Sequence, residues 1–356
     1  MNRATIKNVI KPIAFIICLA LVLQLADFFL CRNDDAKRSY AQIHDFYEQE
    51  DDSLDAILLG ASEVYAFYQP LFAWKTTGIK SWDYANSGRI FGVNAYMLKE
   101  AIKTQPDAVY VISLTRAISS DSAHVHFVSD NMKTSWNKWQ MVNYYCDYGK
   151  EAESTLLERV EYMFPLIRYH SRWDDITLTD IKNMSYEDVK GSATYEQFRT
   201  VTEDQTENML TTDERGEPDD SMLEALDEIL DICDENNVKA VFVTFPRCFG
   251  ADEKNFLPAC NTLGDIITER GYDYLNLVNC VDEIGIDPTT DYYNWRHANV
   301  HGAVKVTKYL AEYLADKYDI ADKRNDSDSA DWDESYETYM SILADDLTDE
   351  DMKILN

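Results

Sequence analysis

Two short segments, far apart in the chain, carry a serine and a histidine in settings that suit nucleophilic catalysis. An apolar run near the front ends in Gly60-Ala61-Ser62-Glu63, and Asn294-Trp295-Arg296-His297 stands near the back, just ahead of an amphipathic stretch. A serine hydroxyl is a weak nucleophile until a neighbouring base, often histidine, takes its proton. If folding brings Ser62 and His297 together, the residues predict serine-dependent chemistry on acyl groups.

The elements that would position these residues alternate between strand and helix. Short apolar or aromatic runs predict strands at 56–59, 81–85, 108–114, 239–245 and 274–277. Amphipathic stretches predict helices at 91–103, 221–236, 252–270 and 300–317. This alternation predicts an α/β fold with a parallel sheet and right-handed crossovers, in which ligands lie beyond the carboxyl ends of the strands. Ser62, Gly88, Arg116 and His297 all lie at or after such ends.

The two segments also resemble a known family. Gly60-Ala61-Ser62 resembles the first sequence block of the SGNH/GDSL hydrolase superfamily, and the segment 294–299 resembles its last block, an Asp-x-x-His that supplies the base. The run 58–63 with a late His-x-Asn-x-x-Gly is similar to the membrane-anchored, DltD-like acyl-transfer branch. The resemblance covers residues 55–118 and 238–318. It implies a three-layer α/β/α domain with a five-stranded, flavodoxin-like parallel sheet.

The resemblance also assigns roles by position. Ser62 would be the nucleophile and His297 the general base. In this superfamily the oxyanion is bound by the serine amide, by a glycine amide after the second strand, where Gly88 stands, and by an asparagine after the third strand. That asparagine is missing here; Thr115 or Arg116 could donate in its place.

A second departure concerns the acid of the family pattern, because Asn294 stands three residues before His297. An amide oxygen can orient the ring but supplies no charge to stabilise an imidazolium, and loss of that charge costs up to ~10⁴-fold in a serine protease. Asp291, six residues before His297, could take the orienting role instead. A descendant that binds ligand without catalysis remains an alternative.

The N-terminus predicts a membrane anchor. Residues 13–30 are nearly all apolar, long enough to cross a hydrocarbon layer of ~30 Å. Arg3, Lys7 and Lys11 precede this run, which places the N-terminal end in the cytoplasm and the rest of the chain outside. The bulky residues after the run lack the small-x-small pattern of a signal-peptide cleavage site, so an uncleaved anchor is favoured.

Composition and spacing divide the chain further. We predict a cytoplasmic stub and anchor at 1–31, a juxtamembrane spacer at 32–50, the α/β domain at 51–318 and an acidic tail at 319–356. The domain contains an aromatic and basic insert at about 119–220, which could be a cap that contacts substrate or an ordinary helical subdomain. In the tail, apolar residues at spacings of three and four predict an amphipathic helix that docks on the body or binds a partner; they are Trp332, Tyr336, Tyr339, Leu343 and Leu347.

Charge and cysteine usage exclude several classes. A net charge of −31 excludes nucleic acid as a partner. The seven cysteines show no metal-like spacing, although Cys248–Cys260 or Cys260–Cys280 could pair in an exported domain. No cofactor and no metal site are predicted, since His297 and His301 at i, i+4 have no evident third ligand.

Together these features predict a membrane-anchored, extracytoplasmic enzyme that moves or removes an acyl group on a cell-surface glycopolymer through an acyl-Ser62 intermediate. The family branch implies a transferase that works with an acylated carrier or beside a multi-pass membrane acyltransferase. Two alternatives stay open: an ester hydrolase (deacetylase) on a surface polysaccharide, and a catalytically inactive binding or scaffold component.

Overall fold

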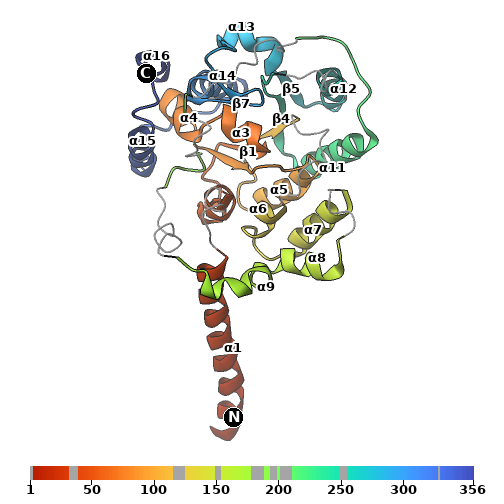
Figure 1. Ribbon diagram of the computed structural model, residues 1–356, viewed down its shortest axis with the longest axis vertical. Coiled ribbons are helices and arrows are strands. Elements are labelled where there is room, and N and C mark those ends of the chain that lie inside the picture. The colour runs from red at the N-terminus through yellow and green to blue at the C-terminus, as the bar shows by residue number, and fades with distance from the viewer. Residues whose placement is uncertain are drawn as a thin grey trace.

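An α/β body and a long N-terminal helix that projects from it make up the protein (Figure 1). The computed structural model describes residues 3–31, 39–114, 125–148, 154–177, 188–192, 199–200, 211–248, 255–327 and 329–356. The candidate oxyanion donors Thr115 and Arg116 lie outside these ranges.

A five-stranded parallel sheet forms the centre of the body. Its strands are β1 (Ala56–Gly60), β2 (Ser81–Ala85), β3 (Val109–Ser113), β4 (Lys239–Thr244) and β5 (Asp273–Asn276). Their order is β2-β1-β3-β4-β5, and each neighbouring pair is parallel. All residues of β1, β2 and β3 are buried, which explains the continuous apolar run of β1, whereas β2 also buries the polar Ser81 and Asp83. The five predicted strands are confirmed, with small shifts at their ends.

Helices connect the strands and pack in two sets. They are α3 (Ser62–Phe67), α4 (Pro70–Thr77), α5 (Val93–Ala101), α11 (Asp220–Asn236), α12 (Phe256–Glu269), α13 (Val281–Ile284) and α14 (Val300–Tyr318). Helix α14 packs on α3 and α4, whereas α11 contacts both α5 and α12. The four predicted helices are confirmed. Helix α4 was not predicted; Pro70 begins it, and Gly78, with a φ of 75°, ends it in the left-handed conformation.

The insert between β3 and α11 is helical where the structure describes it. It contains α6 (Val125–Ser129), α7 (Trp136–Tyr148), α8 (Leu156–Met163), α9 (Pro165–Tyr169) and the 3₁₀ helix η4 (His170–Asp174). Helix α7 packs on α5 of the body, α8 packs on α7, and α9 packs on α8 and on the N-terminal helix. The insert therefore joins the body to the N-terminal helix.

The N-terminal helix α1 (Arg3–Leu30) contains a segment long and apolar enough to cross a membrane. That segment, Ile10–Asp27, has a mean hydropathy of 2.0, and none of it is buried in the protein. The short π and 3₁₀ helices η2 (Tyr40–His44) and η3 (Asp45–Glu48) follow it, and Phe46 stacks on Tyr84 of β2.

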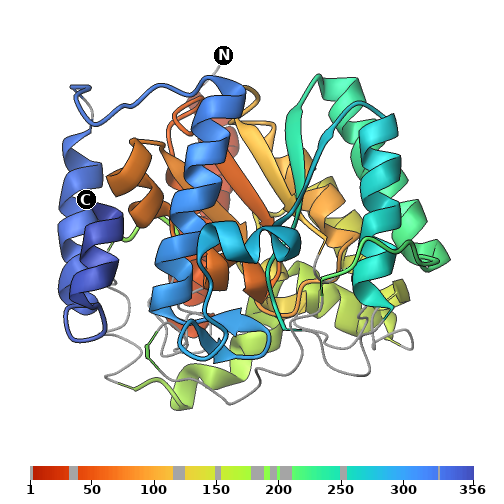
Figure 2. The same cartoon turned by 90° about the horizontal axis from the view of Figure 1, so that it is seen from above.

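The acidic tail docks on the body, which is the first of the two alternatives that the spacing of its apolar residues allowed. It forms α15 (Ala330–Ile342) and α16 (Asp349–Leu355), which lie beside α4 and α14 (Figure 2). Trp332 packs on Trp74 with ring centroids 5.5 Å apart, and Tyr339 packs on Phe72 of α4. The buried Tyr339 hydroxyl donates to Gln69 Oε1 at 2.7 Å.

Neither of the two disulfides that the sequence allowed is formed. Cys248, Cys260 and Cys280, all within the described ranges, are thiols.

Candidate active site

A tight turn after β1 presents Ser62. The strand ends at Gly60, Ala61 is extended, and Ser62 is the first residue of α3. A Cβ atom at Gly60 would lie 2.5 Å from a methyl group of Val64 and 2.7 Å from Cβ of Ser113. Only glycine therefore lets the turn pass this close to β3.

A small hairpin presents His297. It consists of β6 (Tyr292–Asn294) and β7 (His297–Ala298), which are antiparallel. The side-chain oxygen of Asn294 accepts hydrogen bonds from the backbone N–H groups of Arg296 at 2.9 Å and of His297 at 3.1 Å. Asn294 therefore closes the turn, and the turn places the imidazole of His297 against the Asn294 side chain.

The two distant segments meet at the imidazole. His297 Nε2 lies 2.8 Å from Ser62 Oγ, and His297 Nδ1 lies 2.9 Å from Asn294 Oδ1. Because that amide oxygen already accepts from two backbone N–H groups, it faces Nδ1 as an acceptor, so Nδ1 carries the proton. In this tautomer the lone pair of Nε2 can accept from the serine hydroxyl, as a general base requires.

Glu63 supports the serine from the side of the sheet. One of its carboxylate oxygens accepts from the Ala61 backbone N–H at 3.1 Å and from the Ser113 hydroxyl at 2.8 Å. Glu63 is buried, and its bonds tie the turn to the end of β3. In the sequence, the position of Glu63 in the first turn of a helix was enough to explain a carboxylate there. Its second role, as the acceptor that ties the serine turn to β3, could have been found only from the hydroxyl of Ser113 at the end of that strand.

Asp291 does not take the orienting role that the sequence suggested. Its buried carboxylate accepts from Lys305 Nζ at 2.7 Å, from the Asp287 N–H at 2.8 Å and from the Thr290 hydroxyl at 2.9 Å. Its backbone oxygen accepts from the Asn299 N–H at 3.0 Å. Asp291 thus fastens the hairpin to α14, and the side chain at Nδ1 of the imidazole is Asn294.

The candidate oxyanion donors are placed only in part. Ser62 contributes the first amide of α3, and Gly88 lies in the turn after β2 with a φ of 69°. This turn starts beside the serine turn, because the Asn86 N–H donates to the Gly60 carbonyl at 3.4 Å. Asn86 in turn accepts from Arg89 Nε at 2.6 Å. Gly88 therefore shares the carboxyl edge of the sheet with Ser62.

Two arginines lie against Trp295 of the hairpin, and a third, Arg89, is buried beside the turn after β2. The guanidinium groups of Arg296 and Arg247 lie 3.9 Å and 5.9 Å from the ring centre of Trp295. Burial lowers the pKa of Arg89 to about 10. The Trp295 carbonyl accepts from the Cys248 N–H at 2.9 Å, which ties the hairpin to the segment after β4.

Potential metal ligands lie elsewhere. Within the described residues, His44, Asp45 and Glu48 bring ligand atoms together, but they occupy one turn on the surface and His44 already bonds Asp45. His301 does not join His297, because its Nδ1 contacts Asp351 at 2.6 Å and its Nε2 contacts Thr200 at 3.2 Å.

Comparisons with protein-family models, curated proteins and solved structures find no match for this chain.

Proposed function

We propose that this protein is a serine-dependent acyl-ester enzyme of the SGNH/GDSL type, with Ser62 as nucleophile and His297 as base. The observation that carries the proposal is the continuous contact from Ser62 Oγ through the imidazole to Asn294 Oδ1. Residues 235 positions apart meet at hydrogen-bonding distance, and the tautomer inferred from the contact with Asn294 is the one that proton transfer needs.

The proposed reaction proceeds in two halves. Ser62 Oγ attacks the ester carbonyl while its proton passes to Nε2 of His297, and the amides of Ser62 and Gly88 would stabilise the oxyanion. The protonated ring then gives its proton to the leaving alcohol, which produces acyl-Ser62. In the second half an acceptor hydroxyl loses its proton to Nε2, attacks the acyl group and releases the serine.

The fold is consistent with this family. The strand order 2-1-3-4-5 is that of flavodoxin-like doubly wound sheets, whose ligands bind beyond the carboxyl ends of the strands. We infer a three-layer α/β/α arrangement from the two sets of helices, α3, α4 and α14 in one and α5, α11 and α12 in the other. Ser62 and Gly88 follow the carboxyl ends of neighbouring strands.

The proposed place of action is the outer face of a membrane. Helix α1 would cross the bilayer with Arg3, Lys7 and Lys11 on the cytoplasmic side, which leaves the body outside. A substrate on a cell-surface glycopolymer fits that location. The acyl group would come from an acylated carrier or a multi-pass membrane acyltransferase if the acceptor is a sugar hydroxyl; with water as acceptor the protein is an ester hydrolase.

A non-catalytic binding role is the second candidate, and Asn294 is the observation in its favour. A neutral amide orients the imidazole but offers no charge to a developing imidazolium. The same site could therefore hold an ester or a glycopolymer without turning it over.

A fluorophosphonate probe separates the two candidates. The purified full-length protein should be labelled at Ser62, and Ser62→Ala should abolish labelling. Ser341→Ala, which removes an exposed serine of α15, is the matched control and should leave labelling unchanged. Undiminished labelling of Ser62→Ala would remove this serine from its role, whereas no labelling of the folded wild type would favour the binding protein.

A further inference from the structure

Large apolar side chains are exposed on the insert. Among the described residues outside α1, every exposed large apolar side chain lies between 136 and 173; they are Trp136, Tyr148, Leu156, Leu157, Phe164, Ile167 and Trp173. Trp173 is 72% exposed and Leu156 is 71% exposed. Single apolar residues scattered over a surface are ordinary, but a set confined to neighbouring helices marks a contact surface.

These helices lie where α1 leaves the body. Helices α9 and η4 both pack on α1, and Arg172 Nη1 donates to the Leu30 carbonyl at 2.6 Å. Figure 1 shows α8 and α9 at the end of the body from which α1 projects, with α9 lying across the top of α1. A bilayer crossed by α1 would therefore face α8 and α9.

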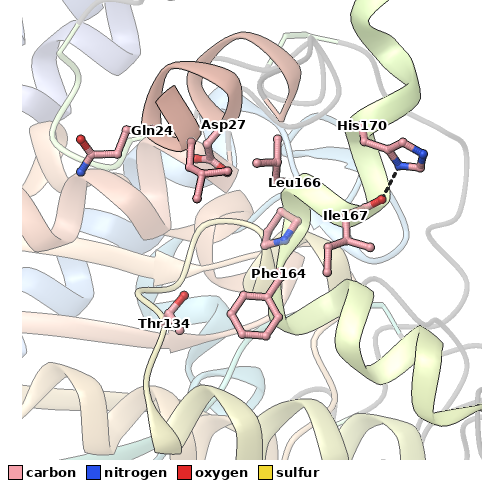
Figure 3. A pocket seen from close by; sticks show the side chains of 9 residues that line it. Gln24, Asp27, Thr134, Phe164, Leu166, Ile167 and His170 are labelled. Carbon is pink, nitrogen blue, oxygen red and sulfur yellow. Dashed lines mark hydrogen bonds between the residues drawn. The ribbon is translucent and has the colours of Figure 1, made fainter. Parts of the chain in front are cut away.

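A groove between α1 and α9 indicates how deep in the membrane these exposed side chains would lie. It has a volume of about 780 Å³ and is lined by Leu23, Gln24 and Asp27 on one side and by Phe164, Leu166 and Ile167 on the other (Figure 3). The apolar segment ends at Asp27, so at 1.5 Å per residue Leu23 lies about 6 Å inside that end. This depth lies within the range of about 5–10 Å to which interfacial helices bury their apolar face.

We propose that α8, α9 and η4 form a second membrane contact, in the interface of the leaflet that surrounds the C-terminal end of α1. Ile167 and Trp173 would lie among the outer segments of the lipid chains, and one acyl chain would fill the groove beside Leu23. Tryptophan favours this interface because its ring is apolar and its N–H is polar. The inference depends on α1 crossing the membrane and is independent of catalysis at Ser62.

The occupant is lipid because the surface continues directly from the lipid-facing helix. Ile10–Asp27 of α1 has no residue buried in the protein, so its whole circumference is available to lipid up to the groove. With α1 as the only attachment, the body could turn about one helix. A second contact fixes which way the carboxyl edge of the sheet, and with it Ser62, faces relative to the bilayer.

Photocrosslinking in a bilayer tests the proposal. The full-length protein is reconstituted in vesicles of phosphatidylcholine and phosphatidylglycerol, with benzoylphenylalanine replacing Leu157, Ile167 or Trp173 one at a time. The same replacement at Glu269, an exposed residue of α12, is the control. After irradiation, mass spectrometry should find lipid adducts at each of the three positions at several times the yield at Glu269.

Two results would overturn it: adduct yields no greater than at Glu269, or crosslinks to a second copy of the chain in place of lipid. Release of the protein from vesicles by alkaline carbonate would do the same, because α1 would not span the bilayer. Repeating the crosslinking with Ser62→Ala should give unchanged adducts. Failure of the membrane contact is thereby distinguished from failure of the proposed enzyme.

Discussion

The substitution Asn294→Asp tests the central weakness of the site, the missing charge behind the imidazole. The side chain at this position lies 2.9 Å from His297 Nδ1 and already accepts from the N–H groups of Arg296 and His297. A carboxylate of the same shape would keep these bonds, and the two backbone donors would favour its charged form. The substitution therefore adds charge with little change in geometry.

The size of the effect follows from the distance. Two unit charges about 4 Å apart interact by about 4 kcal/mol at the effective dielectric constant of a partly exposed site. Each 1.36 kcal/mol is a factor of ten in rate. Since the imidazole is only partly protonated in the transition state and is half-exposed, we expect about 10²- to 10³-fold faster hydrolysis of an activated ester such as p-nitrophenyl acetate.

Matched variants and pH complete the assay. Asn294→Ala, which removes the acceptor and opens the turn, should be slower than the wild type, and Asn236→Asp, which adds the same charge on the exposed end of α11, should change nothing. The gain should shrink at acidic pH as the new carboxylate is protonated. An unchanged or lower rate in a folded Asn294→Asp protein would refute the reasoning that His297 acts as a base limited by charge.

Three further predictions concern other buried groups. Glu63→Ala should slow probe labelling of Ser62 and destabilise the fold by about 1–3 kcal/mol, because two donors lose their acceptor. Glu63→Gln keeps an acceptor oxygen and should have smaller effects. Equal effects of the two substitutions on denaturation and on labelling would contradict this. Asp83 of β2 is buried with neither oxygen bonded to a described residue, and burial raises its pKa well above the usual value. Because the folded protein holds this proton more tightly than the unfolded chain, the free energy of unfolding falls as the pH rises above about 4. Asp83→Val removes this loss, so it should raise Tm at pH 7 by an amount that becomes smaller toward pH 4. A gain in Tm that does not depend on pH would refute the titration of Asp83. The hydrogen bond with Asp351 raises the pKa of His301. Burial by itself would raise the pKa of Asp351, but its hydrogen bonds with His301 and Thr348 outweigh that effect and lower it. Tail docking should then be strongest between about pH 4 and 6.5, weakening as His301 loses its proton above that range and as Asp351 gains one below it; His301→Gln should flatten the Tm profile, and an unaltered profile would rule the pair out.

The centre of the sheet was predictable because β1, β2 and β3 are short and fully buried. The run 56–59 is continuously apolar, and β1 occupies it with one added residue. Helix α4 was missed because its apolar residues face α14 and α15 at once, which leaves no amphipathic period to detect. Its boundaries, Pro70 and Gly78, were the available signals.

The meeting of Ser62 and His297 was predictable from two facts, strand ends that share one edge of a sheet and a base placed ahead of a helix. The choice between Asn294 and Asp291 was not. Both precede His297 in a turn, and only the three-dimensional hairpin shows that Lys305 of α14 pairs with the carboxylate. Long-range partners such as Ser113 for Glu63 are invisible to local pattern for the same reason.

The docked tail has a consequence for how the chain matures. Helices α15 and α16 brace α4 and α14 through the pairs Trp332–Trp74 and His301–Asp351, so residues synthesised after the α/β domain complete contacts of its helices. A nascent α/β domain therefore lacks these contacts until α15 and α16 have left the ribosome. A premature stop in the tail would thus leave the reactive residues intact in sequence while depriving their scaffold of its final support.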